Sequence, residues 1–266
     1  MTNYTYTTVG TTALTLDFAR PAGAGPFPLV VLIHGGGFVA GDKTDRDLDA
    51  LVLAENGFAA ASINYRLMLS DGTNDFPAAV QDVRCAVRSL RENAALFAID
   101  PARVGAMGTS AGAVLSGILG TESDVAGLDE SCGAASNQPV TVKAVAPFFG
   151  AFDLRPGAPM GTTASANADA ALWLHQPPDH PEIDALASAI LHIHASDPPF
   201  LLVHGDADTT IPVAQSANMQ AALQAAGVPA TLVVLPGAPH GFDPMQAVQP
   251  YETGSCTTIA FFKKWL

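Results

Sequence analysis

A serine flanked by glycines is the residue best suited to covalent chemistry in this sequence. Ser110 is the centre of the pentapeptide GTSAG at residues 108–112, which follows an apolar run at 104–107 and precedes helix-like spacing at 113–119. A sharp strand-to-helix turn needs neighbours without bulky side chains, and it exposes the serine hydroxyl beside a helix N-terminus that favours an oxyanion. Ser110 is therefore predicted to be a nucleophile. The alternative is a tight glycine turn that carries an ordinary serine.

An acid and a histidine follow this serine in the chain. A serine hydroxyl is a weak nucleophile until a general base takes its proton, and a carboxylate must hold that base in the right tautomer. In sheet hydrolases the order is serine, acid, histidine. Asp208 follows the apolar run at 200–203, and His240 follows the run at 231–235. We predict His240 as the base and Asp208 as its partner, with Asp206 as the competing acid.

A glycine-rich loop, HGGGF at residues 34–38, follows another apolar run. Backbone N–H groups in such a loop can face a developing negative oxygen. Gly36 and Gly37, together with Ala111 after the serine, are the predicted oxyanion-hole donors, and His34 is expected to brace the loop. A phosphate-binding loop is the alternative, but no Lys-Ser/Thr pair follows the glycines and no G-x-G-x-x-G spacing is present.

The elements that must position these residues alternate between two patterns. Continuous apolar runs are typical of strands covered on both faces, and they alternate with segments of helical spacing, such as 78–92 and 213–226. Residues 12–18 alternate with a period of two, which indicates an antiparallel strand in an N-terminal hairpin. This order predicts an α/β sheet with right-handed crossovers. The apolar runs are residues 29–33, 59–63, 104–107, 142–149, 200–203 and 231–235.

Residues 151–199 fit neither pattern and are rich in Ala, Pro, His and Asp. We interpret this stretch as an insertion that forms a small lid over the site. Its Leu172, Trp173 and Leu174 are expected to supply an apolar wall, with Phe38 and Trp173 lining the substrate pocket. Because no repeat or linker interrupts the sequence, residues 1–266 are predicted to form a single domain.

Composition excludes several classes of partner. Lys and Arg number 12 against 25 Asp and Glu, which gives a net charge of −13, so nucleic acid and anionic membrane surfaces are not expected as partners. No apolar run reaches the roughly 18 residues of a membrane span. No signal peptide is visible, and both a cytoplasmic and a secreted location stay open. The oligomeric state is also left open.

The three cysteines, Cys85, Cys132 and Cys256, lack the paired spacing of a zinc site and allow at most one bridge. Cys85 falls among apolar positions of a predicted helix and is expected to be a buried, unpaired hydrophobe. A bridge between Cys132 and Cys256 is the pairing considered, although their expected places at opposite ends of the sheet disfavour it. His192 and His194 could share a strand face and bind a metal, but no carboxylate-rich pattern supports this. No metal or other cofactor is predicted.

Together these motifs resemble the α/β-hydrolase esterases, specifically their hormone-sensitive-lipase-like and feruloyl/acetyl-xylan-esterase-like branch. The resemblance implies an α/β-hydrolase fold, with a mostly parallel twisted sheet of about eight strands, helices on both faces and a short lid insertion. It also implies a carboxylic ester hydrolase that forms an acyl-enzyme through a Ser-His-Asp triad without a cofactor. Arg66 and Asp153 look like residues that brace this fold. The matching segments are HGGGF at 34–38, NYR at 64–66, the helix at 77–91, GTSAG at 108–112, the stretch 198–208 and PHGF at 239–242.

The resemblance also bears on the substrate. Only about 28 residues precede the first buried strand, whereas the hormone-sensitive-lipase group carries a helical cap there. We therefore expect short-chain acyl or compact aryl esters, either small molecules or acetyl and feruloyl esters linked to plant polysaccharide. The alternatives are an amidase or peptidase of the same fold, arylformamidase-like or prolyl-oligopeptidase-like, and a non-catalytic binding protein.

Overall fold

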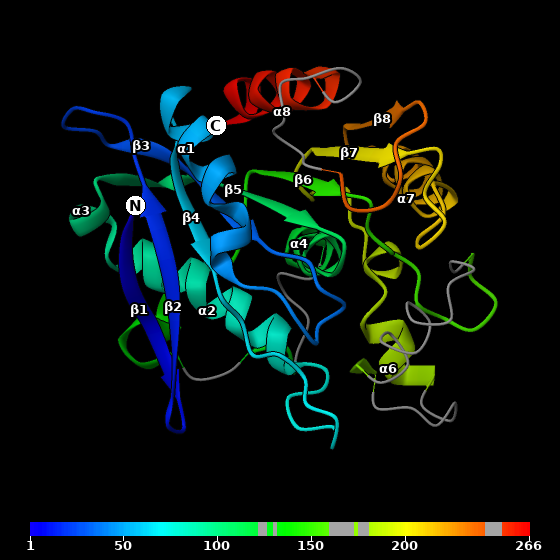
Figure 1. Cartoon of the computed structure of the whole chain (residues 1–266), viewed down its shortest axis with the longest axis horizontal. Coiled ribbons are helices and arrows are strands. Elements are labelled where there is room, and N and C mark those ends of the chain that lie inside the picture. Colours follow the sequence, from blue (N-terminus) through cyan, green and yellow to red (C-terminus); the bar gives the residue numbers. More distant parts are fainter. Residues whose placement is uncertain (122–126, 130–131, 160–172, 175–180, 243–251) are drawn as a thin grey trace.

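A central sheet of eight strands organises the protein (Figure 1). The computed structural model describes residues 1–121, 127–129, 132–159, 173–174, 181–242 and 252–266. The strand order is β1-β2-β4-β3-β5-β6-β7-β8; β2 is antiparallel to both β1 and β4, and the remaining neighbours are parallel. The predicted α/β-hydrolase sheet and its N-terminal hairpin are confirmed. The strands are β1 Thr2–Val9, β2 Thr12–Ala19, β3 Phe27–Ile33, β4 Ala59–Ile63, β5 Ile99–Thr109, β6 Ala144–Phe148, β7 Phe200–Gly205 and β8 Ala230–Leu235.

Helices cover both faces of this sheet. Leu29 and Val31 of β3 pack in the apolar layer that includes α2, α4 and α7, whereas Val30 and Leu32 pack in the layer that includes α1 and α8. This alternation explains why the central strands carry apolar residues on both faces. None of the described helices is both long and apolar enough to cross a membrane. The described helices are α1 Asp47–Glu55, α2 Ala78–Glu92, α3 Ala94–Phe97, α4 Ala111–Thr121, α6 Pro181–Leu186, α7 Ala214–Ala225 and α8 Glu252–Trp265, with 3-10 turns η1 Lys43–Arg46, η2 Gly133–Asn137 and η3 Ala189–Leu191.

The predicted insertion at 151–199 is described only in part. Its last third contains α6 and η3, and Trp173 and Leu174 are both buried. Leu172 lies outside the described residues. The lid function and the single domain remain predictions.

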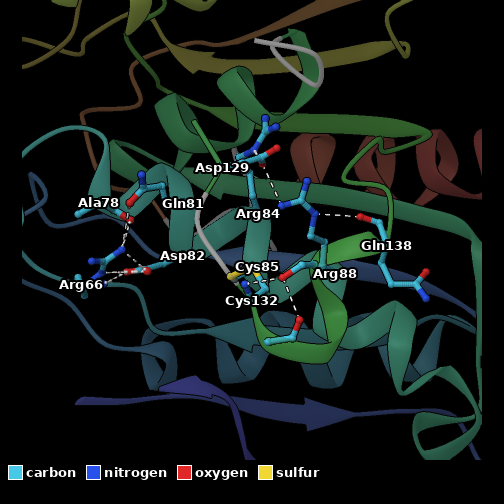
Figure 2. The surroundings of a disulfide bond; sticks show 12 residues. Arg66, Ala78, Gln81, Asp82, Arg84, Cys85, Arg88, Asp129, Cys132 and Gln138 are labelled. Carbon is cyan, nitrogen blue, oxygen red and sulfur yellow. Dashed lines mark hydrogen bonds and ion pairs between the residues drawn. A yellow bond between two sulfur atoms is a disulfide. The ribbon is translucent and has the colours of Figure 1, made fainter. Parts of the chain in front are cut away.

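A disulfide joins Cys85 of α2 to Cys132, which comes just before η2 (Figure 2). The expectation that Cys85 is unpaired is therefore wrong, and Cys132 does not pair with Cys256, whose thiol is free and exposed on α8. The two bridged Cα atoms are 5.5 Å apart. The reason is the path of the chain after α4, because η2 packs against α2 and brings Cys132 beside Cys85. The sequence pattern does not reveal this packing.

Arginines of α2 hold the same connection (Figure 2). Arg84 and Arg88 both pair with Asp129, at 2.8 Å and 2.9 Å. Burial alone would raise the pKa of Asp129, but hydrogen bonds from the two guanidinium groups outweigh it and lower the pKa. Arg91, one turn further along, donates to three backbone carbonyls of the described residues. These belong to Pro101, Pro139 and Thr141, at 3.0, 2.5 and 2.6 Å.

Two residues expected to brace the fold make close ion pairs. Arg66 pairs with the buried Asp82 at 2.8 Å, an interaction also visible in Figure 2. Asp153 pairs with Arg155 at 2.7 Å. Asp82 also accepts the backbone N–H of Arg66 at 2.7 Å, whereas the Asp153 pair is local and joins residues two apart in the chain.

Removal of the disulfide should measurably weaken the fold. We expect Cys132→Ala to lower the free energy of unfolding by about 2–4 kcal/mol, because the bridge restricts the unfolded chain across a long loop. The bridge spans 47 residues. Urea denaturation under non-reducing conditions measures the change. The control Cys256→Ala removes an exposed thiol and should stay within about 0.5 kcal/mol of the parent; equal stability of both variants would contradict the predicted role of the bridge.

Candidate active site

The turn between β5 and α4 presents Ser110 at the carboxyl end of β5, in the middle of the sheet. Ser110 has a positive φ of 52°, a conformation that L side chains rarely adopt. A Cβ at Gly108 would collide with the carbonyl oxygen of Gly112, and a Cβ at Gly112 would collide with that of Ile33. The backbone N–H of Ser110 donates to the carbonyl of Phe148 in β6 at 3.0 Å. The flanking glycines are thus required by close backbone contacts on both sides of the turn.

The structure brings the three predicted triad residues together. Ser110 Oγ lies 2.9 Å from His240 Nε2, and His240 Nδ1 lies 2.7 Å from Asp208 Oδ2. With a neutral imidazole, Nδ1–H donates to the carboxylate and leaves Nε2 to accept the serine hydrogen. Asp206 is placed differently, since its Oδ1 accepts the backbone N–H of Gly237 at 2.6 Å. The geometry therefore favours Asp208 over Asp206 as the partner of His240.

Asp208 is held as a carboxylate by several donors. Its Oδ1 accepts the backbone N–H groups of Thr210 and Ile211, at 2.8 Å and 2.9 Å. Burial alone would raise the pKa of Asp208, but hydrogen bonds from His204, His240 and Ile211 outweigh it and hold the pKa well below the usual aspartate range. Asp208 consequently stays ionised at neutral and moderately acid pH.

The glycine-rich loop after β3 lies in the wall of the cavity. Gly36 and Gly37 have positive φ values of 109° and 61°, and a Cβ at Gly36 would collide with the carbonyl of Ala40. Among the loop and turn backbone hydrogen bonds of the described residues, none uses the N–H of Gly36 or Gly37 as donor. Ala111 is the first residue of α4, where a backbone N–H has no partner within the helix. All three residues line the same cavity as Ser110.

His34 occupies the position expected of a residue that braces this loop. Its Nδ1 lies 2.7 Å from the carbonyl oxygen of Gly35, and its ring stacks on Tyr65 with centroids 4.3 Å apart. The hydroxyl of Tyr65 donates to the His34 carbonyl at 3.1 Å. Burial lowers the pKa of His34, which favours the neutral ring.

A cavity of about 530 Å³ opens at Ser110. Phe38 contributes to its wall as expected, but Trp173 does not appear among the described lining residues. The Trp173 ring is fully buried and stacks behind Phe38, with centroids 3.8 Å apart. Trp173 therefore supports the wall from behind instead of facing the cavity. Among the described residues, the apolar lining comprises Phe38, Ala111, Val114, Phe149, Ala151, Leu154, Ile211 and Phe242.

Phe149 is a site residue that sequence analysis missed. Its ring meets the imidazole of His240 edge-on, with centroids 5.0 Å apart, and contacts Phe242 at 4.7 Å. Phe149 follows β6 directly, and its positive φ of 43° turns the chain there. Its place at the carboxyl end of an apolar run, beside Gly150, is the signal that could have pointed to it.

The two histidines considered as a metal site do not gather a ligand set. His192 Nε2 lies 3.0 Å from the carbonyl oxygen of Ala185. The backbone N–H of His194 donates to the carboxylate of Asp197. Across the residues described, no group of three His, Cys, Asp or Glu side chains is arranged to hold a metal ion. His175 and His180 fall outside the described residues.

The eight-stranded sheet, with a serine at the turn after β5, defines the α/β-hydrolase class. Within that class the chain belongs to the BD-FAE family, whose model matches residues 16–223. These residues include the glycine-rich loop, Ser110 and Asp208, and they end before His240.

The chain is similar to curated proteins that are named as esterases. The chain is 29% identical over 218 residues to the esterase LipQ of Mycobacterium tuberculosis. This alignment covers 81% of this chain and 50% of LipQ. It is also 29% identical over 229 residues to the probable isoprenylcysteine alpha-carbonyl methylesterase ICMEL2 of Arabidopsis thaliana, which covers 84% of this chain and 53% of that protein. The chain thus spans about half the length of these curated relatives.

Solved structures share the fold over nearly the whole chain. A truncated carbohydrate esterase from gut microbiota is 27% identical, with a TM-score of 0.81 and coverage of 99% of this chain and 96% of that one. A propionate-bound esterase from Thermogutta terrifontis has a TM-score of 0.82 at 24% identity, covering 99% of this chain and 93% of that one. At that identity the second likeness supports the fold alone.

Proposed function

We propose that the protein hydrolyses carboxylic esters with Ser110 as nucleophile, His240 as general base and Asp208 as the residue that orients it. The observation that carries this proposal is the unbroken hydrogen-bonded chain from Asp208 through His240 to Ser110, at 2.7 Å and 2.9 Å, in the wall of a cavity. Membership of the BD-FAE family and the esterase relatives support the same reaction.

In the first half of the proposed reaction, Ser110 Oγ attacks the ester carbonyl carbon while His240 Nε2 takes the hydroxyl proton. The carbonyl oxygen becomes an oxyanion that accepts hydrogen bonds from the N–H groups of Gly36, Gly37 and Ala111. Asp208 stabilises the imidazolium through Nδ1–H. When the tetrahedral intermediate collapses, the bond to the alcohol oxygen breaks, and His240 delivers its proton to that oxygen.

The second half repeats these steps with water. His240 removes a proton from a water molecule that attacks the acyl carbon on Ser110. The resulting oxyanion occupies the same donors, and His240 returns the proton to Ser110 Oγ as the acid leaves. Every proton in the cycle passes through His240 Nε2, so the proposed residues are sufficient without a cofactor.

The proposed substrates are short-chain acyl or compact aryl esters. The cavity volume of about 530 Å³ lies in the lower half of the usual range for small-molecule sites, about 300–1,000 Å³. Phe38, Phe149 and Phe242 line it, and rings of this kind suit a compact apolar group. Acetyl and feruloyl groups on plant polysaccharide are substrates of this size.

A panel of soluble esters tests this proposal. We expect kcat/KM to be highest for p-nitrophenyl acetate to butyrate or for methyl ferulate, and to fall about tenfold or more by the octanoate. Each methylene that the cavity covers contributes about 0.8 kcal/mol, or about fourfold in kcat/KM, whereas a chain too long for the cavity must displace side chains of its wall, at a cost of about 1–3 kcal/mol.

Two outcomes of the panel would contradict the proposed pocket. One is a preference for decanoate or longer chains, and the other is a jump in rate at an oil–water interface. Matched anilides and N-formylkynurenine, run beside the esters, test for an amidase. If these amides were hydrolysed faster than the esters, the ester assignment would be overturned.

The pH dependence of kcat/KM should have a single limb in acid. The general base must be unprotonated to accept the Ser110 proton, so protonation of the base in acid removes activity. Asp208 does not add a second limb, because the pKa of its carboxyl group is lowered and it stays ionised there. Initial rates on an uncharged ester, followed in a pH-stat from about pH 4 to 9, measure the limb. A slope of two in acid would show that Asp208 also titrates, against the hydrogen bonding described.

A further inference from the structure

His204, near the end of β7, is a buried histidine that the proposed reaction does not use. Its side chain has no exposed surface. The ring Nε2 lies 2.9 Å from the carbonyl oxygen of Ile211 and 3.3 Å from Asp208 Oδ2. On the other side of the ring, Nδ1 lies 2.7 Å from Ser216 Oγ in α7. His204 therefore touches the proposed triad acid without lining the described cavity.

The partners of His204 fix the position of its proton. A carbonyl oxygen only accepts hydrogen bonds, so the contact with Ile211 requires a hydrogen on Nε2. Nδ1 of the neutral ring is then an acceptor for the hydroxyl hydrogen of Ser216. The opposite tautomer would place a nitrogen lone pair against two oxygens, those of Ile211 and Asp208. The Nε2–H group is consequently shared between the Ile211 carbonyl and the Asp208 carboxylate.

The Nε2–H group of His204 contacts the same oxygen of Asp208 that accepts the hydrogen bond from His240. Asp208 Oδ2 is the atom that accepts Nδ1–H of His240 at 2.7 Å, whereas Oδ1 is held by backbone N–H groups. Without His204, the described contacts of Oδ2 reduce to His240 alone. β7 is paired on both sides, with β6 and β8, so His204 ties Oδ2 to a strand inside the sheet.

We infer that His204 is a positioning residue which, with its tautomer set by Ser216, holds Asp208 in the orientation that aligns His240 with Ser110. The inference rests on the proposed function. It extends the hydrogen-bonded chain to five side chains, from Ser216 on α7 to Ser110 at the end of β5. It also explains a polar ring in a fully buried strand, since burial of a polar group is costly unless its hydrogen bonds are made.

Two isosteric variants separate positioning from packing. The amide of His204→Gln reaches the place of Nε2 and can still donate toward Asp208, whereas the amide of His204→Asn reaches only the place of Nδ1, toward Ser216. We expect His204→Asn to lower kcat by about 10- to 100-fold, the scale of a small misalignment of reacting groups. His204→Gln should stay within about threefold of the parent. KM should change little in either variant, because His204 does not appear among the described cavity residues.

Rates are expressed per active site, counted by exhaustive labelling with a fluorophosphonate, so that a loss of folded protein does not count as a loss of kcat. The matched control is His192→Asn, which changes another histidine bonded to a carbonyl, that of Ala185. It should leave kcat unchanged. If His204→Asn is insoluble, Ser216→Ala replaces it, with an expected loss of about three- to tenfold in kcat.

Unchanged kcat per site in His204→Asn, or in Ser216→Ala where it is used, would overturn the inference. Equal losses in His204→Asn and His204→Gln would also overturn it, because they would indicate packing and not the Nε2 donor. Failure of the proposed function is distinguishable. In that case the parent protein itself would neither label at Ser110 nor hydrolyse the esters.

Discussion

Ser110→Ala is expected to lower kcat/KM for the best short-chain ester by about 10³-fold or more, because loss of a triad nucleophile removes the covalent route. The substitution deletes one oxygen, whose described partner is His240 Nε2 at 2.9 Å. The fold should persist, since alanine differs from serine only by that oxygen. Initial rates on p-nitrophenyl acetate, together with thermal unfolding to confirm the fold, measure the effect.

A serine in the next helix provides the matched control. Ser116 lies buried in α4 and donates to the carbonyl of Ala113 at 3.0 Å, away from the cavity. Ser116→Ala should keep activity close to that of the parent. Activity of Ser110→Ala within tenfold of the parent would remove Ser110 from the proposed mechanism.

Asp208→Asn should lower kcat by about 10³- to 10⁴-fold, as loss of the orienting carboxylate does in other serine hydrolases. The asparagine carbonyl oxygen carries no negative charge to stabilise the His240 imidazolium, and where the asparagine NH₂ faces the ring it favours the tautomer with hydrogen on Nε2. That tautomer cannot take the Ser110 proton.

Asp206→Asn is the paired control for this change. Asp206 uses Oδ1 to accept the N–H of Gly237, and asparagine retains such an acceptor, so activity should stay within about threefold. Both variants are assayed for kcat with the same ester and checked for folding by thermal unfolding. A much larger loss in Asp206→Asn than in Asp208→Asn would reverse the assignment of the acid.

The sequence is sufficient to predict the strands and the order of the site residues. The carboxyl ends of parallel strands lie along the same side of a sheet. The residues that follow β5, β7 and β8 are therefore expected to lie near one another. This rule predicted that Ser110, Asp208 and His240 would converge, and the distances between them agree. The glycine-rich loop after β3 follows the same rule.

Other features depend on contacts that periodicity does not encode. The bridge between Cys85 and Cys132 depends on the packing of η2 against α2, which periodicity in the sequence does not predict. Trp173 was expected in the cavity wall, yet it lies behind Phe38, because the pattern of residues 151–199 does not say which ring faces inward. The sequence did not identify His204 as a positioning residue. Its partner Ser216 lies on α7, and the packing of α7 against β7 cannot be predicted from the sequence pattern.

The reactivity of Ser110 toward a fluorophosphonate tests the central claim most directly, because the reagent requires an activated serine but no particular substrate. Intact-mass measurement and peptide mapping follow the reaction in the parent protein and in His240→Ala. The proposed mechanism predicts one adduct per chain, on Ser110, and labelling at least about 10²-fold slower in His240→Ala. No adduct, an adduct on another residue, or equal rates in the two proteins would contradict it.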